Sequence, residues 1–137
     1  MYLLDTNVVS ELRKSKPDPH VKAWASSIET SRLYLSVITI LELERGVLLI
    51  ERRDSTQGEV LRCWLNERLL PAFAERVLAI DTPVAQRCAA LHVPNPCSER
   101  DALIAATASV HGMTVVTRNN ADFEPTGVAW LNPWQTD

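Results

Sequence analysis

The chain opens with MYLLDTNVVSELR, residues 1–13, in which a short apolar segment passes directly into a helix. Residues 2–4 are apolar and too few for a helix, so they predict a short buried strand that stops at Asp5. From Thr6 to Arg13 the apolar residues return at helical spacing, along one side of a predicted helix. A strand followed at once by a helix is typical of α/β folds that are built on a parallel sheet.

The same alternation of apolar runs and helical segments continues along the rest of the chain. We predict strands at residues 2–4, 33–36, 76–80, 114–117 and 128–131, and helices at 6–13, 20–28, 37–52, 59–70, 82–92 and 98–111. A turn is expected at 54–58, and helix ends are expected at Pro71 and Gly112. The strands are apolar on both faces, which indicates helices on both sides of a mostly parallel sheet. The predicted fold class is therefore α/β.

Length and composition limit the classes of protein to which the chain can belong. It has 137 residues, 46% of them hydrophobic, which predicts one globular domain over residues 1–137. Its 14 basic and 17 acidic side chains give a net charge of −3. A protein that coats nucleic acid through the phosphates would carry a basic excess. Any contact with nucleic acid is therefore expected to be a local patch.

Cysteine and histidine residues show no metal-binding spacing. The cysteines, at 63, 88 and 97, are odd in number and form no C-x-x-C pair, and the histidines, at 20, 92 and 111, are scattered. We interpret the cysteines as reduced thiols and expect no zinc site. No segment approaches the ~20 apolar residues of a membrane span, and no secretory signal is recognisable. We therefore expect a cytoplasmic protein without membrane contact.

Four acidic residues follow the predicted strands or lie in helices near the same edge of the sheet. In open parallel sheets, ligands bind outside the carboxyl ends of the strands. The acids are Asp5, Glu42, Asp101 and Asp122. Each also has a structural interpretation: Asp5 and Asp101 could cap helices, Asp122 could form a turn, and Glu42 could be solvated. Periodicity alone does not choose between Glu42 and Glu44.

A group of carboxylates in one pocket favours a divalent cation. The carboxylates repel one another, and a bound cation removes that cost. Mg²⁺ and Mn²⁺ prefer carboxylate oxygens and water, and they are the usual partners of phosphate chemistry. Short polar residues beside the same strand ends could hold the carboxylates or bound waters in position: Thr6, Asn7, Thr117 and Asn119.

Four blocks of sequence carry further information because of their length and order. They are LDTNVVSE (residues 4–11), ELERG (42–46), DALIAATA (101–108) and TRNNADF (117–123). These blocks resemble the motifs L-D-T-N-x-x-S-E, E-L-x-x-G, D-x-x-I-A-A-T-A and T-x-N-x-x-D-F of the PIN-domain ribonucleases. The resemblance is strongest to the VapC/FitB-like toxins of bacterial type II toxin–antitoxin pairs. The blocks occur in the family's order and span essentially the whole chain.

The resemblance implies a three-layer α/β/α PIN domain with sheet order 3-2-1-4-5, which forms a homodimer. The implied activity is endonucleolytic hydrolysis of RNA that depends on Mg²⁺ or Mn²⁺. The resemblance prefers Glu42 over Glu44, and it adds Glu99 as a weaker candidate because some relatives carry another acid just before the third block. It assigns catalysis and metal binding to four acids: Asp5, Glu42, Asp101 and Asp122.

The resemblance also implies a cognate antitoxin that covers the acidic pocket, with an arginine facing the carboxylates. Promoter DNA would then be bound only through the antitoxin, in agreement with the acidic net charge of the chain. The main alternative function is a non-catalytic, metal-binding partner in a DNA-bound regulatory complex. A phosphatase of the haloacid dehalogenase type is disfavoured, because Asn7 stands where it needs an acid. RNA could be led to the pocket by basic residues, which could equally be solvated: Arg13, Lys14, Lys16 and Arg118.

Overall fold

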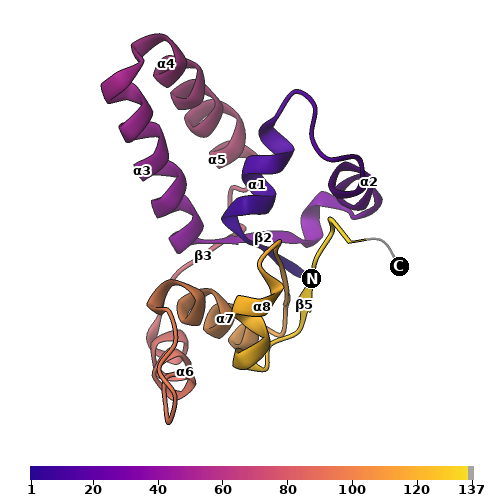
Figure 1. Ribbon diagram of the computed structural model, residues 1–137, viewed down its shortest axis with the longest axis vertical. Helices are drawn as coiled ribbons and strands as arrows, with labels where there is room; N and C mark the ends of the chain where they lie inside the picture. The colour runs from indigo at the N-terminus through magenta and orange to yellow at the C-terminus, as the bar shows by residue number, and fades with distance from the viewer. Residues whose placement is uncertain (136–137) are drawn as a thin grey trace.

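The computed structural model describes residues 1–135, and its centre is a five-stranded parallel sheet (Figure 1). The strand order is β3-β2-β1-β4-β5, which confirms the expected class and order. The strands are β1 (Tyr2–Leu4), β2 (Leu33–Ser36), β3 (Val77–Leu78), β4 (Thr114–Val116) and β5 (Trp130–Leu131). In the central strand β1, Tyr2 pairs with Leu33 of β2 and with Thr114 of β4. The expected domain ends at residue 137, so its last two residues lie outside the described part.

Helices connect the strands and account for most of the remaining chain. The α-helices are α1 (Thr6–Arg13), α2 (Pro19–Ser27), α3 (Val37–Arg53), α4 (Ser55–Cys63), α5 (Leu70–Ala72), α6 (Thr82–Leu91), α7 (Glu99–His111) and α8 (Asn120–Phe123). A π-helical segment lies at Trp64–Leu69, and 3₁₀ turns lie at Thr30–Arg32 and Glu124–Thr126. Within residues 1–135, no helix has the length and apolar character needed to cross a membrane.

Alternate side chains of each strand face two different helical layers. Leu4 and Val116 pack with apolar residues of α1, α2 and α3, whereas Leu3 and Val115 pack with residues of α7 and α8. Figure 1 shows these two groups of helices on opposite sides of the sheet. Strands that are covered on both faces must be apolar on both faces, as the sequence indicated. The three-layer α/β/α arrangement is confirmed.

The segment after α3 differs from the predicted turn at residues 54–58. Only Asp54 interrupts the helices, and its carboxylate accepts a 3.1 Å hydrogen bond from the Gln57 N–H to start α4. Gly58 lies inside α4, where an added Cβ would be 2.7 Å from the Cα of Glu51. Gly58 therefore serves the close packing of α3 against α4, and the turn prediction was wrong because it assigned a packing glycine to a loop.

Other elements also differ from the prediction. The helix that was expected to end at Pro71 continues through Ala72, because Pro71 lies at the start of α5, where proline is tolerated. The strand expected at residues 76–80 is reduced to β3. The sequence did not predict α8, which is held against the sheet by the fully buried Phe123.

The parallel strands place several chain reversals at one edge of the sheet. Helix α1 starts directly after β1 at Asp5, and α3 starts directly after β2 at Ser36. The Asp5 N–H donates to the Val116 carbonyl at 2.9 Å, so the first residue after β1 is still fixed by β4. The backbone of Asp5 is consequently fixed at this edge of the sheet.

Candidate metal centre

Asp5 is the most deeply buried acid at the sheet edge, with no exposed surface. Its Oδ1 accepts the Thr6 N–H at 2.8 Å, so the predicted helix cap exists. Its Oδ2 accepts the Thr117 hydroxyl at 2.8 Å. A buried carboxylate needs compensating donors and charge. Asp5 therefore caps a helix and also belongs to a polar cluster that extends beyond α1.

Glu42 reaches the same cluster from the second turn of α3. Its Oε1 accepts the hydroxyl of Thr6 at 2.5 Å, and it is half-buried. Glu44 points to a different place, where it pairs with Arg62 of α4 at 2.6 Å. The structure thus places Glu42, and not Glu44, beside the end of β1, which periodicity alone could not establish.

Asp101 enters from the first turn of α7, on the other side of the sheet from α3. The Ser98 hydroxyl oxygen accepts the Asp101 N–H at 3.5 Å, in the geometry of an N-cap. The capping pattern in the sequence is therefore real. The Asp101 carboxylate is still available to the cluster, because its backbone N–H and not its side chain makes the capping bond.

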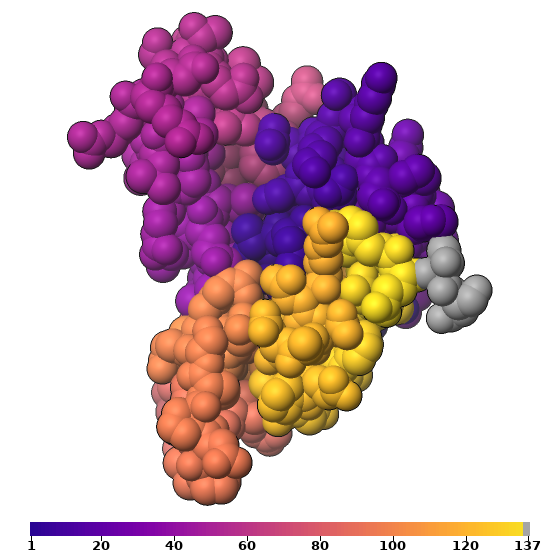
Figure 2. Space-filling model, in the orientation of Figure 1, coloured from indigo at the N-terminus to yellow at the C-terminus, as the bar shows by residue number. Residues whose placement is uncertain are grey.

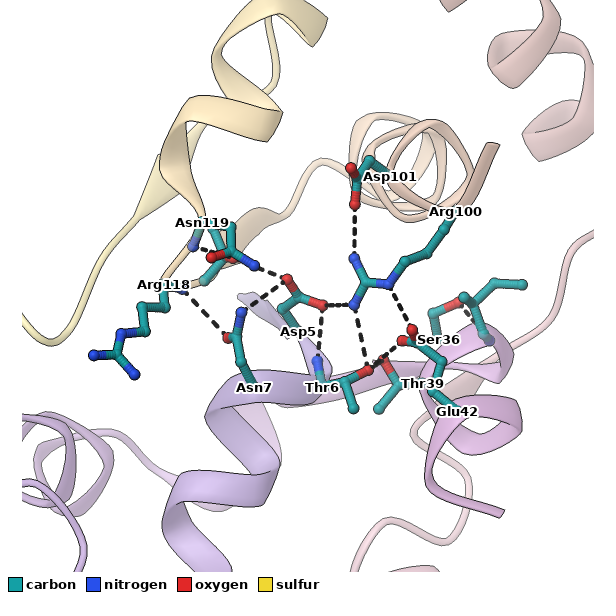
Figure 3. Close-up of polar contacts among 12 residues, drawn as sticks. Asp5, Thr6, Asn7, Ser36, Thr39, Glu42, Arg100, Asp101, Arg118 and Asn119 are labelled. Atoms are coloured by element: carbon teal, nitrogen blue, oxygen red, sulfur yellow. Dashed lines mark hydrogen bonds and ion pairs between the residues drawn. The ribbon is translucent and has the colours of Figure 1, made fainter. Parts of the chain in front are cut away.

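One guanidinium joins these three acids (Figure 3). Arg100 donates from Nε to Glu42 Oε2 and from Nη1 to Asp101 Oδ1, at 2.7 Å each. Its Nη2 donates to Asp5 Oδ1. Carboxylates from the residue after β1, from α3 and from α7 therefore surround a single positive charge. The pairing that the sequence assigned to an antitoxin arginine is made here by an arginine of the chain itself.

Sequence reasoning missed Arg100, although it precedes Asp101 directly. A signal was present, because Arg100 lies in the first turn of α7, where the helix dipole disfavours a positive charge. An arginine at such a position needs acidic partners from elsewhere in the fold. Two of these partners, Asp5 and Glu42, are far from Arg100 in the chain. Neither the neighbouring residues nor the helical periodicity could identify them.

The contacts between Glu42 and Arg100 favour the charged form of each side chain. Burial raises the pKa of Glu42, but the hydrogen bonds from Arg100 and Thr6 and the charge of Arg100 more than offset this, and the net pKa is lowered. Burial lowers the pKa of Arg100, whereas its bonds to Glu42 and Asp5 raise it overall. At neutral pH Glu42 is therefore ionised, and it faces a permanently charged guanidinium.

Asp122 does not join this network. It lies exposed on α8, and its backbone N–H donates to the Asn119 carbonyl at 3.0 Å, a backbone bond and not the side-chain turn that the sequence allowed. Among residues 1–135, its carboxylate makes no hydrogen bond or ion pair that links it to the other acids. Glu99 also lies outside the cluster, since its carboxylate contacts His92 and Cys88.

The polar residues that were expected to support the acids do contact them or one another. Thr6 and Thr117 donate to Glu42 and Asp5, respectively. Asn7 donates a long 3.5 Å bond to Asp5 Oδ2 and accepts the Arg118 N–H at 3.3 Å. The Asn119 N–H donates to the Thr117 hydroxyl oxygen at 3.0 Å, so Asn119 acts on Asp5 only through Thr117.

The four basic residues considered for RNA contact have different surroundings. Arg118 is exposed next to Asn7 and stacks over Trp134 at 5.3 Å. Arg13 stacks over Trp64 at 5.8 Å, and Lys16 is exposed. Lys14 instead forms a 2.9 Å ion pair with Glu11. Arg118 is therefore the one whose backbone is tied to a residue that contacts Asp5.

The structure brings one thiol, one histidine and one carboxylate together, a grouping that the spacing of these residues did not indicate. Cys88, His92 and Glu99 place possible ligand atoms within 4.8 Å of one another. Cys88 lies on α6 and His92 caps the C-terminus of that helix, and the loop before α7 returns Glu99 to them. Metal-motif spacing could not reveal this group, because the third member depends on how the loop folds.

The hydrogen bonding of His92 argues against zinc binding at this group in its present arrangement. The ring Nδ1 accepts the Cys97 N–H at 3.3 Å, so a neutral ring carries its proton on Nε2. That Nε2 is buried without a hydrogen bond and lies 3.4 Å from Glu99 Oε2. A metal ligand usually has the opposite arrangement, with the second ring nitrogen donating.

The Arg100 cluster, formed by Arg100 and the carboxylates of Asp5, Glu42 and Asp101, fits a hard divalent cation better than the Cys88–His92–Glu99 group does. Its donors are carboxylate oxygens from three separate elements, the ligands that Mg²⁺ and Mn²⁺ prefer. A cationic group already occupies the point where the carboxylates meet, which shows that the fold has built a position for positive charge. The residues that could hold a metal there are Asp5, Glu42 and Asp101.

Comparison with known proteins agrees with the sheet topology and the acidic edge. Residues 2–128 match the family model described as PIN domain. The toxin FitB of Neisseria gonorrhoeae is 40% identical over 98% of this chain and 99% of its own. The VapC ribonuclease Y4jK of Sinorhizobium fredii is 39% identical over the same shares. A solved structure of FitAB bound to an IR36 DNA fragment matches with a TM-score of 0.92 and 38% identity, covering 100% of this chain and 98% of that one. The chain belongs to the PIN-domain family.

Proposed function

We propose that the chain is the toxin of a type II toxin–antitoxin pair, and that it hydrolyses RNA with Mg²⁺ or Mn²⁺ at the Arg100 cluster. The observation that carries this proposal is the convergence of Asp5, Glu42 and Asp101 on one cation position. The similarity to a toxin and to a VapC ribonuclease over nearly the whole chain supports the assignment to toxins that cleave RNA. A cytoplasmic location and a homodimer complete the proposal.

Asp5, Glu42 and Asp101 would hold the ion, and Asp122 would complete the set from α8. When bound, the ion would act as a Lewis acid that lowers the pKa of a water molecule and polarises a phosphate oxygen. Thr117 fixes the orientation of Asp5 through Oδ2. Glu42 is ionised at neutral pH, since its pKa is lowered, and its Oε2 can bind the ion or accept a proton. Attack by water, and not by the ribose 2′-oxygen, would leave a 5′-phosphate and a 3′-hydroxyl.

An RNA strand would approach this pocket past basic side chains at its rim. Arg118 is the leading candidate, because it is exposed and its backbone is tied to Asn7. Arg13 and Lys16 are further candidates, whereas Lys14 is partly neutralised by Glu11. The acidic net charge of the chain restricts favourable contacts with phosphates to such local groups.

A cognate antitoxin would have an apolar surface available next to the acids. A cleft of about 410 Å³ begins at Thr6 and Glu42 and continues along α3 and α4. Figure 2 shows the α3–α4 hairpin, in magenta, as a projecting lobe beside the indigo N-terminal segment. Leu43, Val47 and Trp64 line the cleft. An antitoxin segment seated there could cover the metal centre and bind promoter DNA through its other parts.

The second candidate function is that of a non-catalytic, metal-binding partner in a DNA-bound regulatory complex, and the structural match to FitAB bound to a DNA fragment favours it. Incubation of the purified, antitoxin-free protein with total bacterial RNA and Mn²⁺ separates the two. EDTA and Asp101→Asn serve as controls. Discrete cleavage that is lost in both controls, with 5′-phosphate ends, supports the nuclease. An intact, metal-bound protein that cuts no RNA would favour the regulatory function.

A further inference from the structure

We propose that Arg100 is an internal counterion that a divalent cation must displace from Glu42 and Asp5. This inference rests on the proposed metal-dependent function of the site. Its basis is the set of Arg100 contacts, all of which lie within the cluster: Glu42, Asp101, Asp5 and the Thr6 hydroxyl oxygen at 3.5 Å. The guanidinium thereby holds the carboxylates together when metal is absent.

The individual carboxylate oxygens show why the two cations must compete. Asp5 Oδ2 is engaged by Thr117, and Glu42 Oε1 is engaged by Thr6. The other two oxygens, Asp5 Oδ1 and Glu42 Oε2, both accept from Arg100, and Asp5 Oδ1 also accepts the Thr6 N–H. A metal ion that leaves the threonine hydroxyl bonds undisturbed therefore reaches these acids most directly through the oxygens that Arg100 occupies.

The charges at this position give the same result. Three carboxylates carry three negative charges, and Arg100 neutralises one of them. A divalent cation compensates the cluster better, but it is repelled by a guanidinium at the same position. Metal binding therefore becomes an exchange of cations, in which the arginine moves away as the ion enters.

Arg100 is placed so that this movement leaves the fold intact. It projects from the first turn of α7, and its side chain is 31% exposed, so a path to solvent exists. No contact of Arg100 within residues 1–135 holds it to a part of the chain outside the cluster and its own helix. Its departure also removes a positive charge from the N-terminus of α7, where the helix dipole disfavours positive charge.

Calorimetric titration with Mn²⁺ tests this exchange. We expect Arg100→Gln to bind Mn²⁺ about 10- to 100-fold more tightly than wild type, because each hydrogen bond to a charged group that must be broken opposes binding on that scale. Arg100→Lys keeps the charge but loses the planar fork, so it should lie between the two. Arg87→Gln is the matched control: it removes the same charge from an exposed arginine that bonds to Ser109 at 2.8 Å, and it should bind like wild type.

A second measurement uses the NMR signal of the Arg100 side chain to detect its displacement. In wild type, the Nε–H resonance of Arg100, assigned by its absence in Arg100→Gln, should shift on titration with Mg²⁺. Metal-free Arg100→Gln should also melt at a lower temperature than wild type and gain more from added metal. Unchanged or weaker Mn²⁺ binding by a folded Arg100→Gln, or an unmoved Nε–H signal at saturating Mg²⁺, would overturn the exchange. Absence of binding in every variant would refute the proposed metal centre as well, and so distinguishes the two failures.

Discussion

Thr117, at the end of β4, donates a 2.8 Å hydrogen bond from Oγ1 to Oδ2 of Asp5, at the end of β1. Both residues have no exposed surface. The bond satisfies one oxygen of a buried carboxylate and turns the other toward the cation position. The Asn119 N–H donates to the same hydroxyl oxygen, which fixes the direction in which Thr117 donates.

Replacing Thr117 with valine should destabilise the protein by about 1–3 kcal/mol, because Oδ2 of the buried Asp5 carboxylate then keeps only the long 3.5 Å hydrogen bond from Asn7. Valine keeps the shape of threonine, so packing changes little. Urea unfolding of the metal-free protein measures the loss. We also expect weaker Mn²⁺ binding, since Asp5 can rotate when Oδ2 is no longer held.

Thr107→Val is the matched control for that substitution. Thr107 is equally buried, but its hydroxyl bonds only to the Leu103 carbonyl of its own helix, at 2.8 Å. Its loss leaves no buried charge unsatisfied, so the cost should be below about 1 kcal/mol. Equal destabilisation by the two variants would contradict the role assigned to Thr117.

Alanine at the two helical glycines of the α3–α4 hairpin should have opposite effects. At Gly46 a Cβ meets nothing within 4 Å, so Gly46→Ala should stabilise the helix by up to about 1 kcal/mol. At Gly58 a Cβ would lie 2.7 Å from the Glu51 Cα, so Gly58→Ala should cost about 1–3 kcal/mol. Denaturant midpoints check both effects. A stabilised Gly58→Ala variant would show that α3 and α4 pack less closely than described.

Glu11 should make stability depend on pH without taking part in the metal centre. The hydrogen bond from Lys14, followed by the N–H of Asp18, lowers its pKa below the ordinary value of 4.5. A lowered folded pKa means that this contribution is complete above about pH 4.5 and is lost as pH falls through the folded value. Glu11→Gln keeps an oxygen for the Asp18 N–H but removes the charge.

Urea unfolding between pH 7 and pH 3 measures this contribution. Wild type should exceed Glu11→Gln in stability at neutral pH, and the two should converge in acid. Glu59→Gln, which removes an exposed acid on α4, controls for net charge. A difference that persists unchanged to pH 3 would mean that the Glu11 contacts do not depend on its charge.

The sequence predicted most of the fold because the determining signals are local. The strand that ends at Asp5 and the helix ended by Gly112, which has a φ of 67°, can both be identified from neighbouring residues. The turn at residues 54–58 failed, since the reason for Gly58 is contact with α3 and not local conformation. Likewise, α8 is stabilised by burial of Phe123, which its polar neighbours conceal.

The candidate site was predictable to a different degree for each residue. Strand-end position pointed to Asp5, and the capping pattern pointed to Asp101, but only the family resemblance selected Glu42 over Glu44. Arg100 and the Cys88–His92–Glu99 group were missed, because each depends on contacts between elements that are distant in the chain or joined by an irregular loop. The place of Asp122 in the proposed set stays a prediction.

The paired variants Glu42→Gln and Glu44→Gln test the central claim most directly. Both remove one charge from α3, but Glu42 faces Arg100, whereas Glu44 pairs with Arg62. The measurement is the rate of RNA cleavage at saturating Mn²⁺, with folding verified by circular dichroism. The account predicts a loss of at least about 100-fold for Glu42→Gln, since an ion ligand should matter more than the residues that orient it, and little change for Glu44→Gln. Equal activity of the two variants would contradict a catalytic metal centre at this cluster.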